Sequence, residues 1–218
     1  MSDIIQQHGN YQDLISYRNS VVIFDATVKF CAIFLKQGDR TIDQMTQAAR
    51  SGKQNIIEGC EAAAISTETE IKLYGVARAS LEELLEDYRD YLRTHNMTLW
   101  NRNDPRILSF REAINQNGTN EQVCSQFLIP EKTEQFCNIV ITLIHQTNFL
   151  LDRHLRKLEQ TFSAKGGLKE RMYAARIKAR GSQRAEGIVI LREIYRELTK
   201  KGENNLAKKL EQAAQLLK

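Results

Sequence analysis

Apolar residues recur at alternating spacings of four and three along much of this chain, which leaves few folds open to it. In the first such stretch, within residues 11–36, the recurring residues are Tyr17, Val21, Phe24, Val28, Cys31 and Leu35. This spacing places their side chains on one face of an α-helix. Only 2 prolines and 11 glycines interrupt the 218 residues, so turn-forming positions are scarce. The pattern predicts an all-α fold and excludes all-β and collagen-like folds.

The same spacing predicts four long helices. They are expected at about residues 11–36, 41–63, 67–94 and 130–162. Gly52 and Gly59 lie on the apolar face of the second helix. Because glycine is costly inside a helix, these two positions predict close approach of a neighbouring helix to the backbone.

Local signals mark the third helix and the connector that follows it. Thr67 and Glu70 have the spacing of a capping box, which is expected to start the third helix. Residues 95–130 lose the long helical spacing and are interpreted as a connector inserted between long helices. Within it, one short helix is expected from Pro105 to about residue 115, because proline is favoured in the first turn of a helix.

The C-terminal segment differs from the rest of the chain. After the pair Gly166 and Gly167, three shorter helical stretches separated at Gly181 and Gly202 are expected at about residues 168–180, 184–201 and 204–217. We therefore divide the chain into a helical domain at residues 11–162 and a helical suffix at residues 163–218.

The suffix carries most of the positive charge. Residues 161–218 contain 14 Lys and Arg against 6 Asp and Glu, whereas residues 1–160 contain 17 against 21. Such asymmetry favours a polyanionic partner. The candidate nucleic-acid-binding residues form one basic cluster, with Tyr173 interleaved, made of Lys165, Lys169, Arg171, Arg176, Lys178, Arg180 and Arg184.

The chemistry of this cluster suits RNA. Arginine guanidinium groups match phosphate oxygens in a bidentate arrangement, and a tyrosine ring can stack on an unpaired base. Single-stranded or structured RNA is therefore expected in preference to DNA. The alternative interpretation is a solvated helix face without a ligand.

No catalytic, cofactor or metal site is predicted. The cysteines are scattered without a C-x-x-C pair and are interpreted as reduced core thiols: Cys31, Cys60, Cys124 and Cys137. His145 and His154 fall on an apolar helix face, where a hydrogen-bonded core role is commoner than metal binding. The sequence also lacks a G-x-S-x-G elbow and a phosphate-binding loop, so we expect a protein that is not an enzyme.

A membrane-bound protein is not expected either. No segment reaches the roughly 18 uninterrupted apolar residues that a membrane span needs. The first residues, Met1, Ser2 and Asp3, do not begin a basic region ahead of an apolar one, so no secretory signal is readable. The sequence predicts a soluble, cytoplasmic protein.

Two segments carry a resemblance to a known family. Residues 47–59 (QAARSGKQNIIEG) and 77–84 (ARASLEEL), with Ser66, Glu68 and Glu70 between them, resemble the bacterial four-helix-bundle proteins first met in intervening sequences of large-subunit ribosomal RNA genes. Residues 166–172 (GGLKERM) look like the start of the C-terminal extension in the four-helix-bundle suffix subgroup.

The resemblance implies an up-down four-helix bundle over residues 11–162. Relatives that serve as accessory proteins of diversity-generating retroelements form pentameric rings and bind RNA or DNA through basic surfaces. In this chain the bundle portion is acidic on balance, so the resemblance and the charge together direct the expected binding to the suffix.

The sequence therefore leads to two hypotheses. The first is a homo-oligomeric, possibly pentameric, protein that is not an enzyme and binds nucleic acid through the basic cluster. The second is a protein-protein adaptor or self-assembling scaffold that does not bind nucleic acid.

Overall fold

The computed structural model describes residues 10–203, 205–206 and 208–210, and every regular element among them is helical. The all-α prediction is confirmed. The elements are Tyr11–Asp13 (η1, a 3-10 helix), Ile15–Phe34 (α1), Arg40–Ala62 (α2), Thr67–Thr94 (α3), Pro105–Asn117 (α4), Glu121–Ser125 (α5), Thr133–Lys165 (α6) and Leu168–Lys200 (α7). The chain divides between Gly167 and Leu168 into two compact units, which we call the bundle unit and the C-terminal unit.

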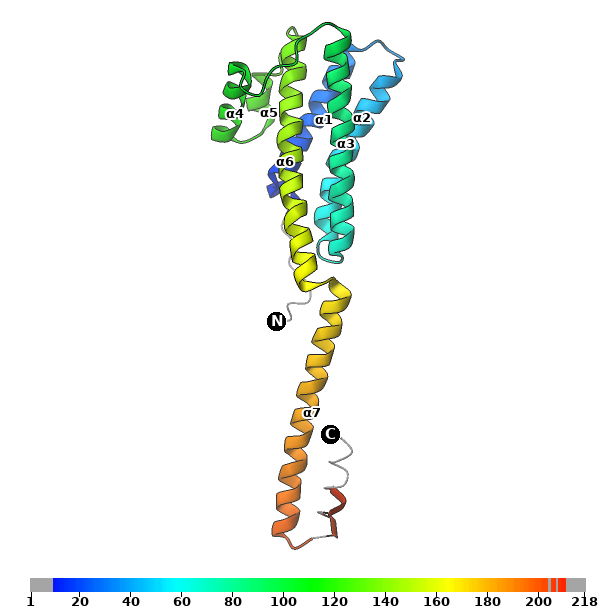
Figure 1. The fold of residues 1–218 in the computed structure, drawn as a ribbon, viewed down its shortest axis with the longest axis vertical. Helices are drawn as coiled ribbons and strands as arrows, with labels where there is room; N and C mark the ends of the chain where they lie inside the picture. Colours follow the sequence, from blue (N-terminus) through cyan, green and yellow to red (C-terminus); the bar gives the residue numbers. More distant parts are fainter. Residues whose placement is uncertain (1–9, 204, 207, 211–218) are drawn as a thin grey trace. The chain divides into compact units, whose positions relative to one another are not determined.

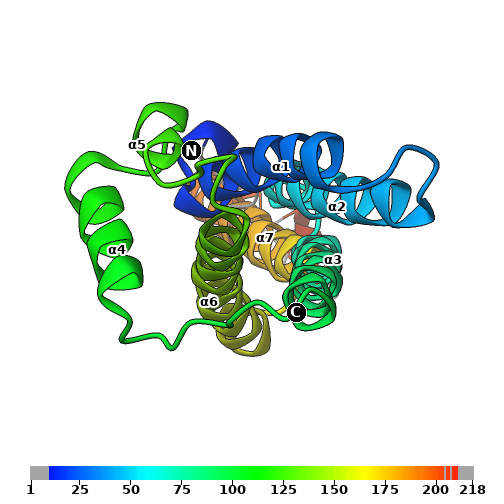
Figure 2. The same ribbon diagram turned by 90° about the horizontal axis from the view of Figure 1, so that it is seen from above.

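Four helices enclose the core of the bundle unit. α1 contacts α2 and α6, and α3 contacts the same two helices (Figures 1 and 2). Phe30 lies at the centre, with its ring centroid 4.9 Å from that of Tyr88 and 6.0 Å from that of Phe136. The buried Tyr88 hydroxyl donates to Thr27 Oγ1 at 3.1 Å. An aromatic cluster with a satisfied hydroxyl therefore joins α1, α3 and α6.

The seam between α2 and α3 is very close at the two predicted glycines. A Cβ atom on Gly52 would lie 2.8 Å from Leu81 Cδ2, and one on Gly59 would lie 3.2 Å from Tyr74 Cε2. Beside this contact, the hydroxyl oxygens of Ser51 and Ser80 lie 2.9 Å apart. The prediction of close backbone approach is confirmed, because a larger residue would meet buried side chains of α3.

The start of α3 differs from the predicted capping box. Ser66 is the N-cap: its backbone is extended, and its Oγ accepts from the Thr69 amide at 3.2 Å. Glu70 does not serve the cap. It is buried, and its Oε1 lies 3.4 Å from Nε2 of His154 on α6. The predicted capping box from Thr67 to Glu70 is therefore wrong by one residue, because the chain enters the helix at Thr67 and the cap falls one position earlier.

The end of α3 uses an asparagine where glycine is usual. Asn96 has a φ of 55°, and the Met97 amide donates to the Leu92 carbonyl at 2.9 Å. The Asn96 amide donates to the Arg93 carbonyl at 3.3 Å, which completes a Schellman motif. Met97 packs against the hydrophobic core, to which the buried Leu92 belongs. The chain thus turns sharply into the connector.

The connector contains the short helix predicted from Pro105 and a second one that was not predicted. α4 buries Ile107, Phe110 and Ile114, and α5 buries Val123 and Cys124. α4 contacts both α5 and α6, and both short helices lie to one side of the four long ones (Figure 2). The connector therefore forms a small added layer on the bundle.

The C-terminal unit contains one long helix where separate stretches were expected. α7 continues through Gly181, so the predicted break there is wrong. Each interior glycine costs about 1 kcal/mol, and a helix of 33 residues can tolerate the two that α7 contains, Gly181 and Gly187. Gly202 ends the helix as predicted: it has a φ of 77°, and the next amide, of Glu203, donates to the Leu198 carbonyl at 3.0 Å.

Residues 205–206 and 208–210 are helical, and the remainder of the third predicted stretch lies outside the described residues. Across the described part of the chain, no helix combines the length and the apolar character that crossing a bilayer requires.

Candidate nucleic-acid interface

Four of the residues that prompted the nucleic-acid hypothesis share one face of α7. Tyr173, Arg176, Arg180 and Arg184 follow each other at spacings of three, four and four, which align on a helix. All four are exposed, and 68% of the Tyr173 surface is accessible. We call this set the arginine stripe. The sequence predicts separate helices here. Because α7 is one continuous helix, it aligns the residues on either side of Gly181.

The stripe lies in a stretch of strongly positive charge. Residues 172–185 contain Lys178 in addition to the three arginines and no acidic residue. Ile177, next to the stripe, exposes 52% of its surface, so the face combines cations with an aromatic and an aliphatic side chain. Such a face can pair with phosphate oxygens and stack on bases.

Lys178 does not belong to the stripe. It stands two residues from both Arg176 and Arg180, which places it on roughly the opposite side of the helix. There Lys178 shares a helix face with Arg192 and Arg196, which are also exposed. The basic cluster predicted from sequence thus divides between two faces of α7.

Three predicted residues have only their backbone placed. Lys165 is the last residue of α6, in the bundle unit, whereas Lys169 and Arg171 stand near the start of α7. Their side chains lie outside the described parts of the structure. The geometry of the candidate interface therefore comes from the remaining predicted residues and Tyr173.

The four cysteines are buried and form no disulfide, as expected of core thiols. Burial raises the pKa of Cys31 and of Cys124 to about 11, and that of Cys137 to about 12. Burial also raises the pKa of Cys60. Since the thiolate is the nucleophile, these positions suit packing better than catalysis.

Polar side chains of α3 and α6 contact each other across the bundle. His154 lies against Glu70 and the ring of Tyr74, whose centroid is 4.6 Å away. Arg78 on α3 donates to Asp152 on α6 at 2.5 Å. No group of histidine, cysteine and acidic side chains within the described ranges has the geometry of a metal site. These contacts link helices.

The structure contains a cavity that the sequence did not indicate. It has a volume of about 520 Å³ and lies where α1, α4 and α6 meet. Each of these helices contributes a polar side chain: Asn19, Arg111 and His145, respectively. The three residues are separated by long stretches of sequence, so no motif could have revealed the cavity.

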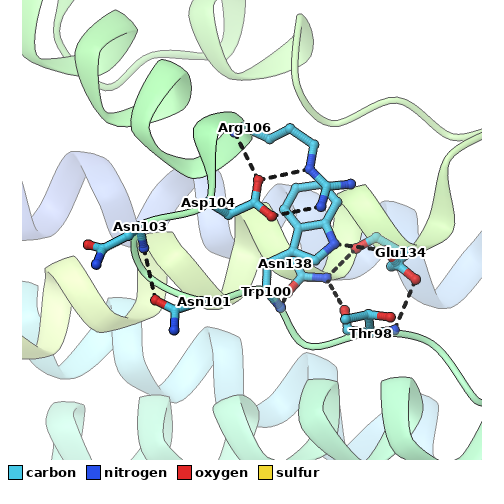
Figure 3. A network of polar contacts seen from close by, with 8 residues as sticks. All are labelled: Thr98, Trp100, Asn101, Asn103, Asp104, Arg106, Glu134 and Asn138. Carbon is cyan, nitrogen blue, oxygen red and sulfur yellow. Dashed lines mark hydrogen bonds and ion pairs between the residues drawn. The ribbon is translucent and has the colours of Figure 1, made fainter.

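The position of α4 beside this cavity depends on a network between the connector and α6 (Figure 3). The Thr98 amide donates to Glu134 Oε2 at 2.9 Å, and Trp100 Nε1 donates to Glu134 Oε1 at 2.8 Å. The Trp100 amide donates to Asn138 Oδ1 at 2.7 Å, and Asn138 Nδ2 donates to the Thr98 carbonyl at 2.9 Å. We call these four residues the connector clip.

The connector clip extends to the first turn of α4. The guanidinium carbon of Arg106 lies 3.4 Å from the centroid of the Trp100 ring (Figure 3). Arg106 also donates to Asp104, the N-cap of α4, at 2.7 Å. One tryptophan therefore joins α6 to the start of α4, and α4 carries Arg111 to the cavity.

Comparison of the chain with protein-family models, with curated proteins and with solved structures found no match.

Proposed function

We propose that this is a cytoplasmic nucleic-acid-binding protein that is not an enzyme, and that it binds RNA in preference to DNA. The observation that carries the proposal is the alignment of Arg176, Arg180 and Arg184 with Tyr173 on one exposed face of α7. The charge of residues 161–218, with 14 basic against 6 acidic residues, supports a polyanionic ligand.

The preference for RNA follows from the mixture of side chains. A helix that reads duplex DNA presents groups to base edges in a major groove, whereas unpaired RNA bases are accessible for stacking. Tyr173 offers a ring that stacks on any base, and the arginines offer phosphate contacts that do not depend on sequence. We expect binding to single-stranded or looped RNA with little sequence specificity.

The test compares two triple variants of the full chain. Arg176→Gln/Arg180→Gln/Arg184→Gln removes the charges of the arginine stripe, and Lys178→Gln/Arg192→Gln/Arg196→Gln removes three charges from the opposite side. Affinity for a short single-stranded RNA is measured by fluorescence anisotropy across a salt series. The stripe variant should lower the slope of log K against log salt by about 2, at roughly 0.7 per phosphate contact.

The control variant should bind RNA nearly as tightly as the unmodified chain, because it has the same net charge as the stripe variant but keeps the stripe. Equal losses in both variants would show that net charge alone drives binding. No binding of the unmodified chain at low salt would reject the proposal.

We further infer that the bundle unit has the up-down four-helix topology. The inference is supported by the contacts of α1 and α3 with both α2 and α6, which close a ring, and by the short connections between α1, α2 and α3. Membership of the bacterial intervening-sequence family stays a prediction from the resemblance, as does a pentameric assembly.

A second candidate function is self-assembly through α7. Ile190 and Ile194 lie one turn apart and expose 56% and 41% of their surfaces. An exposed apolar pair on a long helix is typical of contact with a second copy of that helix. Light scattering on the samples used for RNA binding distinguishes the candidates, because a defined oligomer that fails to bind RNA would favour self-assembly.

A further inference from the structure

The cavity between α1, α4 and α6 is cationic. Arg18 and Arg111 line it, together with His145, and no carboxylate does. Arg89 of α3 reaches His145 from beyond the lining, with its Nη2 3.3 Å from the imidazole Nε2. Arg18 on α1 and Arg111 on α4 thus bring positive charge to one hollow of about 520 Å³, which His145 on α6 also lines and which is within the range of small-molecule sites.

Burial and the neighbouring charges together favour the neutral form of His145. Partial burial, followed by the positive charges of Arg89 and Arg111, lowers the pKa of His145. Glu82 and Glu86 on α3 act in the opposite direction and do not outweigh these effects. The imidazole is therefore mostly neutral at pH 7, and the cavity has a surplus of positive charge that an anion would offset.

Two buried polar atoms beside the cavity have no partner within the protein. Asn19 is 2% exposed, and its Oδ1 accepts no hydrogen bond. The buried Nε of Arg111 donates none. Buried groups left unpaired are rare and costly, so each needs an explanation. Both atoms are closed off from solvent, so a ligand in the cavity would pair with them only after the Asn19 and Arg111 side chains turn toward it.

The cavity also offers an aromatic surface and a further amide. Phe149 lines it and exposes 63% of its surface, which is unusual for a phenylalanine on a core helix. Gln146, one turn from Phe149, contributes an amide that can donate and accept. Arginines, amides and an exposed ring are the set that proteins use on an unstacked nucleotide.

We propose that this cavity binds a mononucleotide, either free or as an unpaired residue of an RNA strand. Arg18 and Arg111 hold the phosphate, Phe149 stacks on the base, and the amides of Asn19 and Gln146 pair with base or ribose groups. All of these residues belong to the bundle unit and none to the arginine stripe. The proposal therefore does not rest on the function proposed for α7.

The first experiment uses the full chain and adenosine and uridine 5′-monophosphates, with binding measured by calorimetry. The corresponding nucleosides and inorganic phosphate serve as comparison ligands. Both nucleotides should bind more tightly than phosphate or nucleoside alone, because only they use both halves of the site. Equal binding of inorganic phosphate, or no binding of either nucleotide at millimolar concentration, would overturn the proposal.

Three variants locate the site. Arg18→Gln and Phe149→Ala change exposed side chains, so the fold should survive, and each should weaken nucleotide binding by about tenfold. Arg50→Gln, which removes an exposed arginine of α2 outside the cavity, should leave the affinity unchanged. If all three variants bind as the unmodified chain does, the nucleotide binds elsewhere and the proposal is wrong.

A spectroscopic readout separates occupancy of the cavity from a structural effect. A phosphate beside Arg111 should raise the pKa of His145, because it offsets the charges that lower it, so the imidazole resonance should titrate at higher pH in the presence of nucleotide. An unchanged titration at saturation would contradict the site. In the stripe variant, competition by a short oligoribonucleotide would show that the ligand is an unpaired residue of an RNA strand. A lack of competition would show that the ligand is a free nucleotide.

Discussion

At the scale of single residues, two glycines determine how closely α2 and α3 approach. Their role was readable from sequence, because glycine on the apolar face of a helix has little reason to occur except close contact. The choice between Ser66 and Thr67 as the cap of α3 was not readable. Both side chains can accept from a helix amide, and only the backbone conformation at Ser66 distinguishes them.

Replacing Gly52 by alanine should destabilise the protein. The added Cβ would meet Leu81 Cδ2 at 2.8 Å and Cγ at 2.9 Å, in a fully buried side chain. Overpacking lowers the unfolding free energy by about 1–3 kcal/mol. The higher helix propensity of alanine offsets about 1 kcal/mol of this loss. We expect urea unfolding to show a net loss of up to about 2 kcal/mol in unfolding free energy for Gly52→Ala.

Gly75→Ala is the matched control, because a Cβ at this position of α3 meets nothing within 4 Å. It should stabilise the protein by about 0.5–1 kcal/mol through helix propensity alone. Changes of the same sign in the two variants would show that the seam relaxes around the added methyl group.

At the scale of elements, agreement with the sequence prediction follows the length and regularity of the apolar pattern. α2 and α3 begin and end within one residue of their predicted bounds, whereas α6 begins at Thr133, three residues after Pro130. α5 was not predicted, since Glu121–Ser125 is less than two turns and has no period to detect. Continuation of α7 through Gly181 was not predicted either, because the cost of one glycine depends on the rest of the helix.

The connector clip makes a prediction at this scale, with a defined pH dependence. Hydrogen bonds from the Thr98 amide and from Trp100 lower the pKa of Glu134 below its ordinary value of 4.5. The folded protein therefore binds this proton less readily than the unfolded chain does. The contribution of Glu134 to stability is present above pH 4.5 and is lost as the pH falls through the lower folded value.

We expect Glu134→Gln to reduce the unfolding free energy at pH 7 by about 1 kcal/mol, because the amide cannot accept from both donors. The difference between variant and unmodified chain should shrink as the pH is lowered below about 4.5. Glu131→Gln, a neutralisation at an exposed position just before α6, should have little effect. Denaturant titrations at several pH values measure this, and a difference that does not change with pH would argue against the carboxylate as the acceptor.

At the scale of the whole molecule, the hydrophobic core belongs to one unit. The cluster of buried and half-buried apolar residues begins at Leu14 and ends at Leu158, ahead of the junction after Gly167. Sequence patterns indicated which faces are apolar. They could not indicate the cavity, because its walls come from α1, α4 and α6, and the place of α4 depends on its own contacts with α5 and α6 as well as on those of Trp100 with α6.

A chain that ends at Gly167 should therefore fold. We expect it to retain a cooperative thermal transition in circular dichroism, with a midpoint close to that of the full chain, because none of the core residues in the described part of the chain is removed. It should also retain nucleotide binding in the cavity and lose the RNA binding of the arginine stripe. A chain without a cooperative transition would mean that the C-terminal unit completes the core.

The unbroken course of α7 through Gly181 has a consequence for the size of an RNA site. Arg176 and Arg180 precede this glycine and Arg184 follows it, so a bend there would separate the charges. In a straight helix, at about 1.5 Å per residue, Tyr173 and Arg184 stand roughly 16 Å apart along the axis. A stacked strand rises about 3.4 Å per nucleotide, so the arginine stripe spans roughly five nucleotides of such a strand.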